Sequence, residues 1–352
     1  MFSFLKPKKV IGLDVGSSSI KVVEMDVGRN SATLQSFGFA PTPMDTISAG
    51  ELRETTAVAT VVRSLLNETK SRRKFVCTCL SGNAVIVRKM TIPKLEKKFI
   101  REHVRFEAEA NLPFDINQVS LTHHLLNLQQ SPDSMEVLVI AAQNALINQY
   151  QELSNLIGVP LGVLDISGFA LANAFEFNYG KLPGVVGLFN FGASTTNVVV
   201  LYNGETVFCR DVPFGGNLYT NEIHRNLGVT IPEAEALKLA AMSGKEEAEP
   251  VQSVISATNE QFNEEIRNQI DVIKASTNGL TLSRCFYTGG ASQTPGLIEA
   301  ASRVVGAPME PLNPLIRVKA NSKRFPKDYL NQISPFISLV MGLGLRQIGD
   351  AS

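Results

Sequence analysis

The chain has 352 residues, a length typical of about two domains and sufficient to bury a substantial core. Apolar residues make up 44% and charged residues 19%, a balance that indicates a globular rather than a disordered protein. Lys plus Arg and Asp plus Glu number 33 each, and this zero net charge argues against a nucleic-acid partner held by bulk electrostatics. No apolar stretch reaches the roughly 20 residues of a transmembrane helix, and no secretory signal opens the chain. We therefore expect a cytoplasmic protein without a transmembrane segment.

A repeat at half the chain length is the most informative pattern. Residues 10–28, VIGLDVGSSSIKVVEMDVG, align with residues 186–204, VGLFNFGASTTNVVVLYNG. Each copy is typical of a strand, a Gly-rich turn and a second β-branched strand, and a third strand is expected to follow at 32–40 and at 206–213. Two such halves predict an α/β protein in which two related lobes face a cleft.

The other elements follow from apolar periodicity and from the positions of Pro and Gly. Further strands are expected at 75–80, 84–90, 119–128, 136–142, 161–165 and 284–288. Helices are expected at 51–70, 93–111, 144–157, 218–227, 232–242, 249–277, 295–305 and 335–348. The segment 310–329, rich in Pro, Lys and Arg, is expected to be loop. Residues 83–158 thus form a β-α-β-β-α unit inserted in the first half.

The turns of the repeat carry the first chemical signal. Glycine at Gly16 and Gly192 permits a tight turn, and the small residues that follow let backbone N–H groups and hydroxyls converge on an anion. Consecutive Gly289 and Gly290, between a strand and a helix, allow close approach of a flat ligand such as a nucleotide base. The alternative is two ordinary hairpin turns and a strand-to-helix loop capped by a Ser or Thr.

Three segments together resemble a known superfamily. IGLDVGSSSIK, GLFNFGASTTNVVV and TGGASQTPGL look like the phosphate-1, phosphate-2 and adenosine motifs of the actin-like ATPases. The inserted unit resembles the extra subdomain of the FtsA branch. Within that branch the chain is similar to the PilM family of type IV pilus assembly proteins, through RKMTIPKL, FEAEANLPFDINQVSL and VPFGGNLYTNEI. The resemblance implies an actin-like ATPase fold, with two ribonuclease-H-like lobes around a nucleotide cleft and an FtsA-type inserted subdomain.

The resemblance also implies a division of the chain. Residues 1–82 and 159–183 would form the first actin-like lobe, and 83–158 the inserted, peptide-binding subdomain. Residues 184–334 would form the second lobe, and a C-terminal helix in 335–352 would return to the first.

ATP and Mg²⁺ are the ligands that the resemblance implies, and Asp14 would hold Mg²⁺ through its waters. The β- and γ-phosphates would be lined by Gly16, Ser17, Ser18, Ser19 and Lys21. The opposing phosphate turn would be Gly192, Ala193, Ser194 and Thr195, with Gly216 nearby. The ribose or base would contact Glu235 and Lys238, and the adenosine would be covered by Gly289, Gly290, Ala291 and Ser292. Without the resemblance, Glu235 and Lys238 would be typical of an exposed helical ion pair.

One residue departs from the family pattern. The phosphate-2 motif normally begins with Asp, and this chain has Asn190. Asn keeps the shape and the hydrogen-bonding ability but lacks the second negative charge that helps to organise metal and attacking water. We therefore expect nucleotide binding to survive better than hydrolysis, with at most a weak ATPase activity and no certain catalytic residue.

The resemblance further implies a partner. The inserted subdomain would bind the N-terminal cytoplasmic peptide of the inner-membrane protein PilN, in a groove between helix 94–111 and the strands of the insert. This would recruit the protein to the inner face of the bacterial inner membrane and couple it indirectly to the pilus motor ATPases and the inner-membrane platform. Self-association stays open.

Two alternatives remain at this point: an FtsA-like, filament-forming cell-division or cytoskeletal protein, and a small-molecule kinase. The first would carry an amphipathic targeting helix after a linker, which is not seen after Arg346. The second would need a catalytic carboxylate in the cleft, which Asn190 removes.

Overall fold

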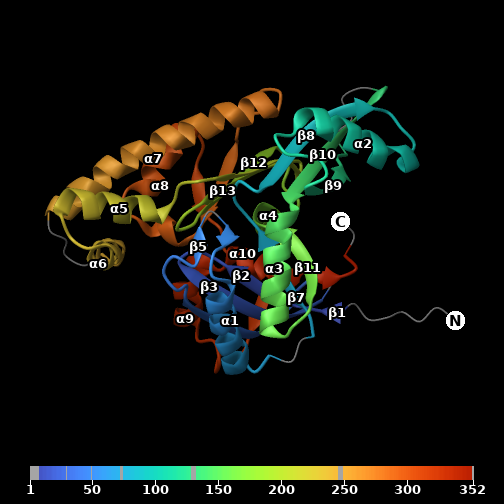
Figure 1. Cartoon of the computed structure of the whole chain (residues 1–352). Helices are drawn as coiled ribbons and strands as arrows, with labels where there is room; N and C mark the ends of the chain where they lie inside the picture. The colour runs from blue at the N-terminus through green and yellow to red at the C-terminus, as the bar shows by residue number, and fades with distance from the viewer. Residues whose placement is uncertain are drawn as a thin grey trace.

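The computed structural model describes residues 8–28, 30–48, 50–71, 74–127, 132–244 and 249–350. Two sheets with their covering helices form the body of the molecule, and a smaller sheet with α2 lies at one end (Figure 1). Within the described ranges no helix combines the length and the apolar character that a membrane crossing needs.

The first sheet has six strands. In spatial order they are β11 (Leu161–Ile166), β7 (Val76–Leu80), β2 (Ile11–Val15), β3 (Ser19–Val27), β4 (Ala32–Pro41) and β17 (Val318–Ala320). β2, β3 and β4 form the antiparallel meander expected from the first repeat. Helices α1 (Thr55–Thr69) and α3 (Asn144–Ile157) cover one face, where Leu13, Val62 and Tyr150 share a buried cluster.

The second sheet repeats this plan with five strands. In spatial order they are β14 (Glu205–Val212), β13 (Thr196–Tyr202), β12 (Val185–Phe191), β15 (Arg284–Thr288) and β16 (Met309–Pro311). Its helices are α5 (Gly216–Leu227), α6 (Ile231–Met242), α7 (Glu249–Ser276) and α8 (Leu297–Val305). Phe189, Tyr219 and Phe262 anchor the core between this sheet and the helices. The second meander, β12-β13-β14, confirms the internal repeat.

Helix α4 (Ser167–Tyr179) is shared by the two sheets and was not among the expected helices. Leu171 and Phe175 are buried with residues of the second sheet, whereas Ala170 is buried with Cys77 and residues of the C-terminal helix α10 (Ser338–Leu345). A helix buried on both sides carries apolar residues all round, so it lacks the one-sided stripe that marks a surface helix.

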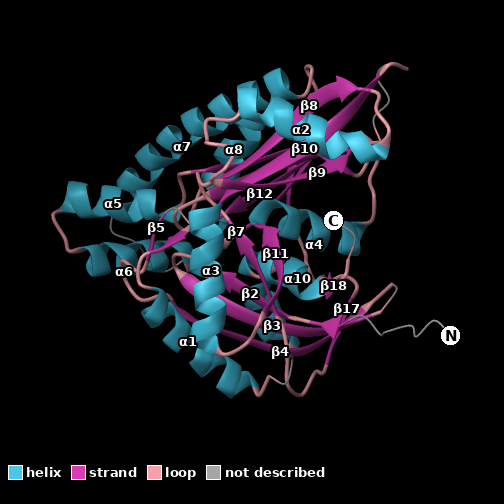
Figure 2. Cartoon of the chain, turned by 45° about the vertical axis from the view of Figure 1, so that its right-hand side comes forward, coloured by secondary structure: helices cyan, strands magenta, loops and turns pink. Residues whose placement is uncertain are grey.

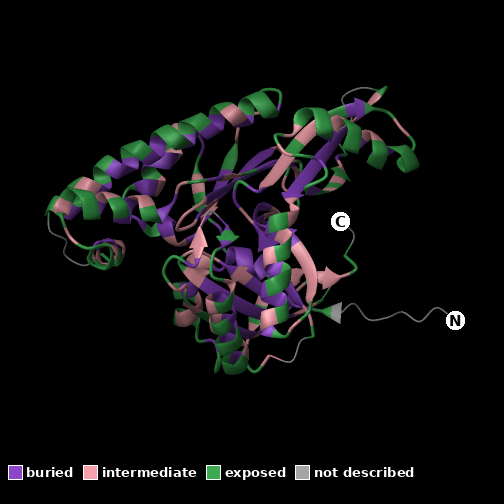
Figure 3. Cartoon of the chain, viewed as in Figure 1, coloured by how far each residue is buried: buried purple, intermediate pink, exposed green. Residues whose placement is uncertain are grey.

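The inserted unit has its own sheet, in the order β8 (Val85–Pro93), β10 (Ser134–Gln143) and β9 (Val119–Leu125). Helix α2 (Lys97–Asn111) covers one face of this sheet (Figure 2). Its Ile100 and Val104 are buried against that face. The opposite face contributes Leu126 and Leu138 to the core of the second lobe. Figure 3 shows β10 largely buried and the outer side of α2 exposed, while β8 and β9 are mostly intermediate or exposed.

The segment 310–329 is not the loop that the sequence predicts. It contains β17, the end of β16 and the start of α9 (Lys327–Ile333). β17 pairs in parallel with β4, and Phe325 is buried with Val23 of the first sheet. The chain therefore returns to the first sheet at Val318, earlier than the expected return at residue 335. A few spaced apolar residues are enough to anchor the segment there.

Short elements complete the fold: β1 (Lys8–Lys9), β18 (Gln347–Ile348), β5 (Ile47–Ser48), β6 (Glu51–Leu52) and two 3₁₀ turns at Gly290–Gln293 and Ser334–Phe336. β1 pairs with β18, and β5 with β6. Cys77, Cys79, Cys209 and Cys285 are buried and free.

Candidate functional site

A cavity of about 620 Å³ lies between the lobes, lined by the β2–β3 turn, the β12–β13 turn, the start of α5, helix α6 and residues 289–291. The structure thus brings together segments that are far apart in the sequence. Every residue predicted for the nucleotide and metal sites lines this cleft except Ser292. The Ser292 hydroxyl is buried and donates to the Gly289 carbonyl oxygen at 2.7 Å, so it supports the turn from within.

The two repeat turns have the same backbone geometry. The Gly16 N–H donates to the Ser19 carbonyl at 3.2 Å, and the Gly192 N–H donates to the Thr195 carbonyl at 3.0 Å. The hydroxyl of Thr42, which directly follows β4, donates to the Gly16 carbonyl oxygen at 2.6 Å and so stabilises the first turn. Such turns direct neighbouring N–H groups and hydroxyls to one side, where an anion can accept from them.

An ion pair lies beside the first turn. Lys21 Nζ is 2.9 Å from Asp14 Oδ2, and the two side chains are only 9% and 13% exposed. They face each other across the β2–β3 pair, where Asp14 is the register partner of Lys21. A cation and a carboxylate are therefore both present at the first repeat turn.

Lys238 is buried, unlike the exposed ion pair that its spacing from Glu235 would otherwise indicate. Its ammonium donates to Glu235 Oε2 at 2.7 Å, to Thr220 Oγ1 at 2.9 Å and to the Gly216 carbonyl at 3.3 Å. These contacts tie α6 to the start of α5 at the wall of the cleft. The three acceptors match the three donors of the ammonium, so Lys238 is held in a fixed position beside the cavity.

The glycine pair after β15 runs close to the second sheet. Gly289 has φ of +98°, and a Cβ there would lie 2.3 Å from the Phe191 carbonyl oxygen. A Cβ on Gly290 would meet nothing within 4 Å and Gly290 lines the cleft, so a side chain there would extend into open space. The backbone itself therefore forms this wall, which suits a flat ligand.

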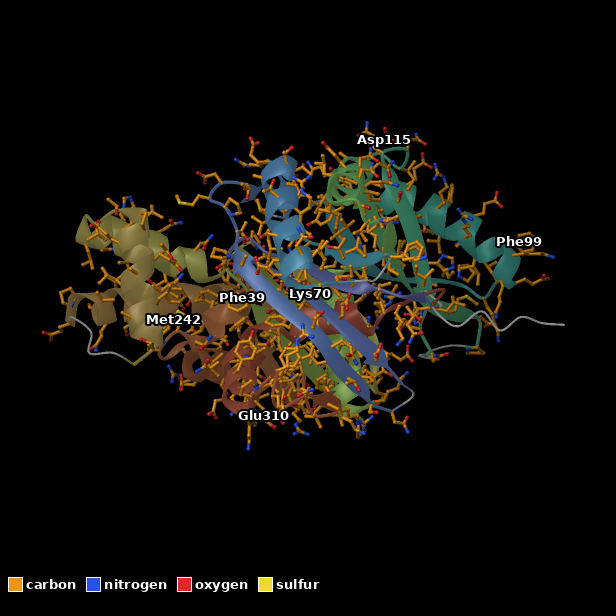
Figure 4. The ribbon with its side chains drawn as sticks, turned by 90° about the horizontal axis from the view of Figure 1, so that it is seen from below. Phe39, Lys70, Phe99, Asp115, Met242 and Glu310 are labelled. Carbon is orange, nitrogen blue, oxygen red and sulfur yellow. The ribbon has the colours of Figure 1, made fainter. Side chains whose placement is uncertain are left out.

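Several lining residues were missed by sequence reasoning. Leu239 is 53% exposed, and Met242 follows it on α6, opposite Phe39 of the first lobe (Figure 4). Asn197 and Ser167 lie behind Asn190, in hydrogen-bonding contact with Asp211. The sequence gives no sign of Leu239 and Met242 as lining residues, because the exposure of Leu239 beside the buried Lys238 is known only from the structure. The Asn197 and Ser167 contacts depend on strand pairing and leave no local signal.

Both cationic and acidic side chains line the cleft. The charged residues that line the cleft are Asp14, Lys21, Glu235 and Lys238. In the part of the chain that the structure describes, no three His, Cys, Asp or Glu side chains cluster as a metal site would require. A cation here would be held through Asp14, water and ligand oxygens, which is the mode that Mg²⁺ prefers.

A second hollow, of about 550 Å³, lies on the inserted unit between α2 and β9. Its cationic residues are Lys98, Arg101 and Arg105, against one acidic residue, Glu102. β9 is an edge strand that pairs only with β10 among the described strands. An open strand edge beside a basic helix offers both backbone and charged contacts to an extended acidic segment.

Comparisons with known proteins agree with this architecture. The fold is that of the actin-like ATPases: the ethanolamine utilization protein EutJ from Carboxydothermus hydrogenoformans superimposes with a TM-score of 0.55 at 16% identity, covering 97% of this chain and 90% of EutJ. MreB5 of Spiroplasma citri, solved with AMPPNP, gives a TM-score of 0.51 at 10% identity and coverages of 95% and 94%.

The family follows from closer matches. The model of the family described as type IV pilus assembly protein PilM matches residues 12–348, so the chain belongs to this family. The solved PilM–PilN type IV pilus biogenesis complex gives a TM-score of 0.86 at 28% identity, covering 96% of this chain and 98% of that one. The cell division protein FtsA of Agrobacterium fabrum is 26% identical over 151 residues, and the match spans only 34% of the length of that relative.

Proposed function

We propose that this chain is an ATP-binding component of the type IV pilus assembly complex. The observation that carries the proposal is the meeting of the two repeat turns, where the Ser17 and Ser194 hydroxyl oxygens lie 2.6 Å apart in the lining of the cleft. The buried Lys238 and the glycine pair after β15 supply the walls beyond them. AMPPNP binding by the structurally similar MreB5 supports a nucleotide in a cleft of this fold.

Each part of the cleft has a role in this proposal. The two turns donate to the phosphates from opposite lobes, and Lys21 adds positive charge beside them. Asp14 would hold Mg²⁺, and the ion would neutralise phosphate charge. Lys238 and Glu235 fix the ribose or base, while Leu239 and Met242 offer apolar contact to the adenine.

Turnover by this site is expected to be slow at most. The Asn190 side chain stands where a carboxylate would help to position metal and attacking water, and its amide donates to Asn197 Oδ1 at 2.6 Å. A carboxamide is not basic enough to take a proton from the attacking water. The protein would then use ATP mainly as a bound ligand that sets lobe closure.

The inserted unit would bind PilN. The solved complex shows that a PilM protein assembles with PilN, and this supports the same partner here. We place the N-terminal cytoplasmic peptide of PilN in the hollow between α2 and β9, where an extended chain can pair with the edge strand. Peptide binding would recruit the protein to the inner face of the inner membrane, and lobe closure would act indirectly on the motor ATPases and platform.

The test uses point substitutions, because deleting the insert would strip Leu126 and Leu138 from the core of the second lobe. Charge reversal by Arg101→Glu and Arg105→Glu should weaken binding of the PilN peptide at least tenfold in calorimetry and leave ATP binding unchanged. Arg267→Glu, on the exposed side of α7, is the matched control. Loss of both ligands together, or of neither, would contradict the assignment of the peptide to the insert.

A further inference from the structure

A chain of hydrogen bonds leads from a carboxylate in β14 to the cleft. Asn197 Nδ2 donates to Asp211 Oδ1 at 2.7 Å, and Asn190 Nδ2 donates to Asn197 Oδ1 at 2.6 Å. Asn190 and Asn197 are register partners on β12 and β13, and both line the cleft. Asp211 is thus linked through Asn197 to Asn190, which stands where the family's phosphate-2 motif carries its Asp.

The same carboxylate also contacts the connection to the insert. Asp211 Oδ2 accepts from the Gly82 backbone N–H at 2.7 Å, and Gly82 precedes the first strand of the inserted sheet. The Ser167 hydroxyl, at the start of α4, lies 3.2 Å from both oxygens. Three elements that are distant in sequence therefore meet at one side chain.

The chemistry of the carboxylate fixes the direction of every bond in this chain. An ionised carboxylate only accepts, so Asn197 must turn its NH₂ toward Asp211 and its carbonyl toward Asn190. Asn190 must then turn its own NH₂ toward Asn197. The Asn190 carbonyl oxygen is then the group available to a ligand in the cleft. This oxygen lies next to the glycine pair, 2.7 Å from the position that a Cβ on Gly289 would occupy.

We infer that Asp211 is a positioning residue, which orients Asn190 through Asn197 so that an oxygen faces the cleft, and which ties this arrangement to the insert through Gly82. The inference rests on the proposed function for the identity of the ligand, Mg²⁺ with ATP. It deepens that proposal, because the oriented Asn190 amide presents an oxygen acceptor to the cleft at the position where the family's phosphate-2 carboxylate is missing.

The burial of the group is consistent with this role. Burial raises the pKa of Asp211, and the hydrogen bonds from Gly82, Asn197 and Ser167 oppose the rise. A carboxylate withdrawn from water is costly unless several donors hold it. Here three donors converge on it, which is the arrangement that a fixed orienting group requires.

Asp211→Asn tests the inference in the full-length protein. A carboxamide has one acceptor oxygen and one NH₂, so it cannot accept from both Gly82 and Asn197. Either the Gly82 amide loses its acceptor, or the amides of Asn197 and Asn190 turn over and present NH₂ to the cleft. We expect at least tenfold faster hydrogen exchange at Gly82 or at least tenfold weaker Mg·ATP binding. Glu264→Gln removes one charge from the exposed side of α7 and should change neither.

A second variant guards against misfolding of the first. Asn190→Asp cannot donate to Asn197, so it should lower the melting temperature. In the double variant, the new carboxamide at position 211 can donate to Asn197, whose NH₂ then faces the new carboxylate at position 190. Asp211→Asn is therefore harmful in the wild type but restorative in the Asn190→Asp protein.

Additive effects in the double variant, or unchanged exchange and affinity in Asp211→Asn, would overturn the inference. A wild-type protein that binds no Mg·ATP would overturn the proposed function instead. Gly82 exchange and the melting temperatures of the three variants would then still decide whether Asp211 orients the amides.

Discussion

Ser17 and Ser194 meet across the cleft, with their hydroxyl oxygens 2.6 Å apart, although they are 177 residues apart in the chain. They lie in the two repeat turns, one on each lobe, although the alignment of the repeat pairs Ser194 with Ser18. The two lobes therefore contact each other through the groups that are proposed to hold phosphate. A ligand between the turns would exchange this hydrogen bond for bonds to its own oxygens, so the contact links ligand binding to lobe separation.

Substitution of the two serines should show that they act as a pair. Ser17→Ala and Ser194→Ala should each weaken ATP binding by roughly fivefold, since a hydrogen bond contributes about 1 kcal/mol. The double variant should lose less than the sum, because the two hydroxyls share one environment. Ser302 on α8 does not line the cleft, and its hydroxyl donates to the Ala307 carbonyl oxygen, so Ser302→Ala should not affect calorimetric binding. Independent, additive losses would contradict a shared site.

Two glycine substitutions should have opposite effects. Gly290→Ala adds a methyl group to open space in the cleft, so it should weaken ATP binding at least tenfold with little change in melting temperature. Gly158→Ala also meets no atom within 4 Å, but Gly158 has φ of +74°, so it should cost about 1 kcal/mol of stability and leave ATP affinity intact. Equal ATP affinity in both variants would place the ligand away from this glycine turn.

Lys238 offers a test against a matched ion pair. Lys238→Met removes the donor to Gly216, Thr220 and Glu235, and it should weaken ATP binding by roughly 10- to 100-fold, as expected for hydrogen bonds to a charged group. Arg267 and Glu264 on α7 also form an i,i+3 pair, but both are mostly exposed. Arg267→Met should therefore change neither affinity nor stability measurably. Equal affinities in the two variants would show that Lys238 is only structural.

The ion pair between Arg346 and Asp165 predicts a pH-dependent effect on stability. Burial raises the pKa of Asp165 and Arg346 opposes the rise. Arg346→Met leaves the carboxylate unpaired and should lower the free energy of unfolding by about 3–5 kcal/mol at neutral pH. The folded-state pKa then rises further above the unfolded value of 3.8, so the folded state binds a proton that the unfolded state does not.

The deficit of Arg346→Met should therefore shrink as the pH falls from neutral through the raised pKa toward the unfolded value. Urea denaturation of wild type and variant across this range measures it. The double variant Asp165→Asn/Arg346→Met has no carboxylate at position 165. Its free energy of unfolding should therefore lack the pH dependence that the unpaired Asp165 gives to Arg346→Met. A deficit in Arg346→Met that is constant with pH would show that the carboxylate does not need its partner.

The repeat could be predicted from sequence because each meander is a local unit, with two β-branched strands around a glycine turn. The burial of Lys238 could not, since an i,i+3 spacing from Glu235 suits an exposed pair equally well. The contact between Asp211 and Gly82 spans 129 residues and depends on how the insert packs against β14. Helix α4 was not predicted because it is buried on both sides. Its apolar residues therefore lie all round the helix and leave no one-sided apolar stripe in the sequence.

Calorimetric titration of Mg·ATP into the wild type and into Asp14→Asn decides whether the cleft is a nucleotide site. Asn keeps the size of the side chain but lacks the charge that would attract the hydrated cation. We expect one site in the wild type, with Mg²⁺-dependent affinity, and at least tenfold weaker binding in the variant at an unchanged melting temperature. Absence of ATP binding in the wild type, or equal Mg²⁺-dependent affinity in both proteins, would contradict the proposed function.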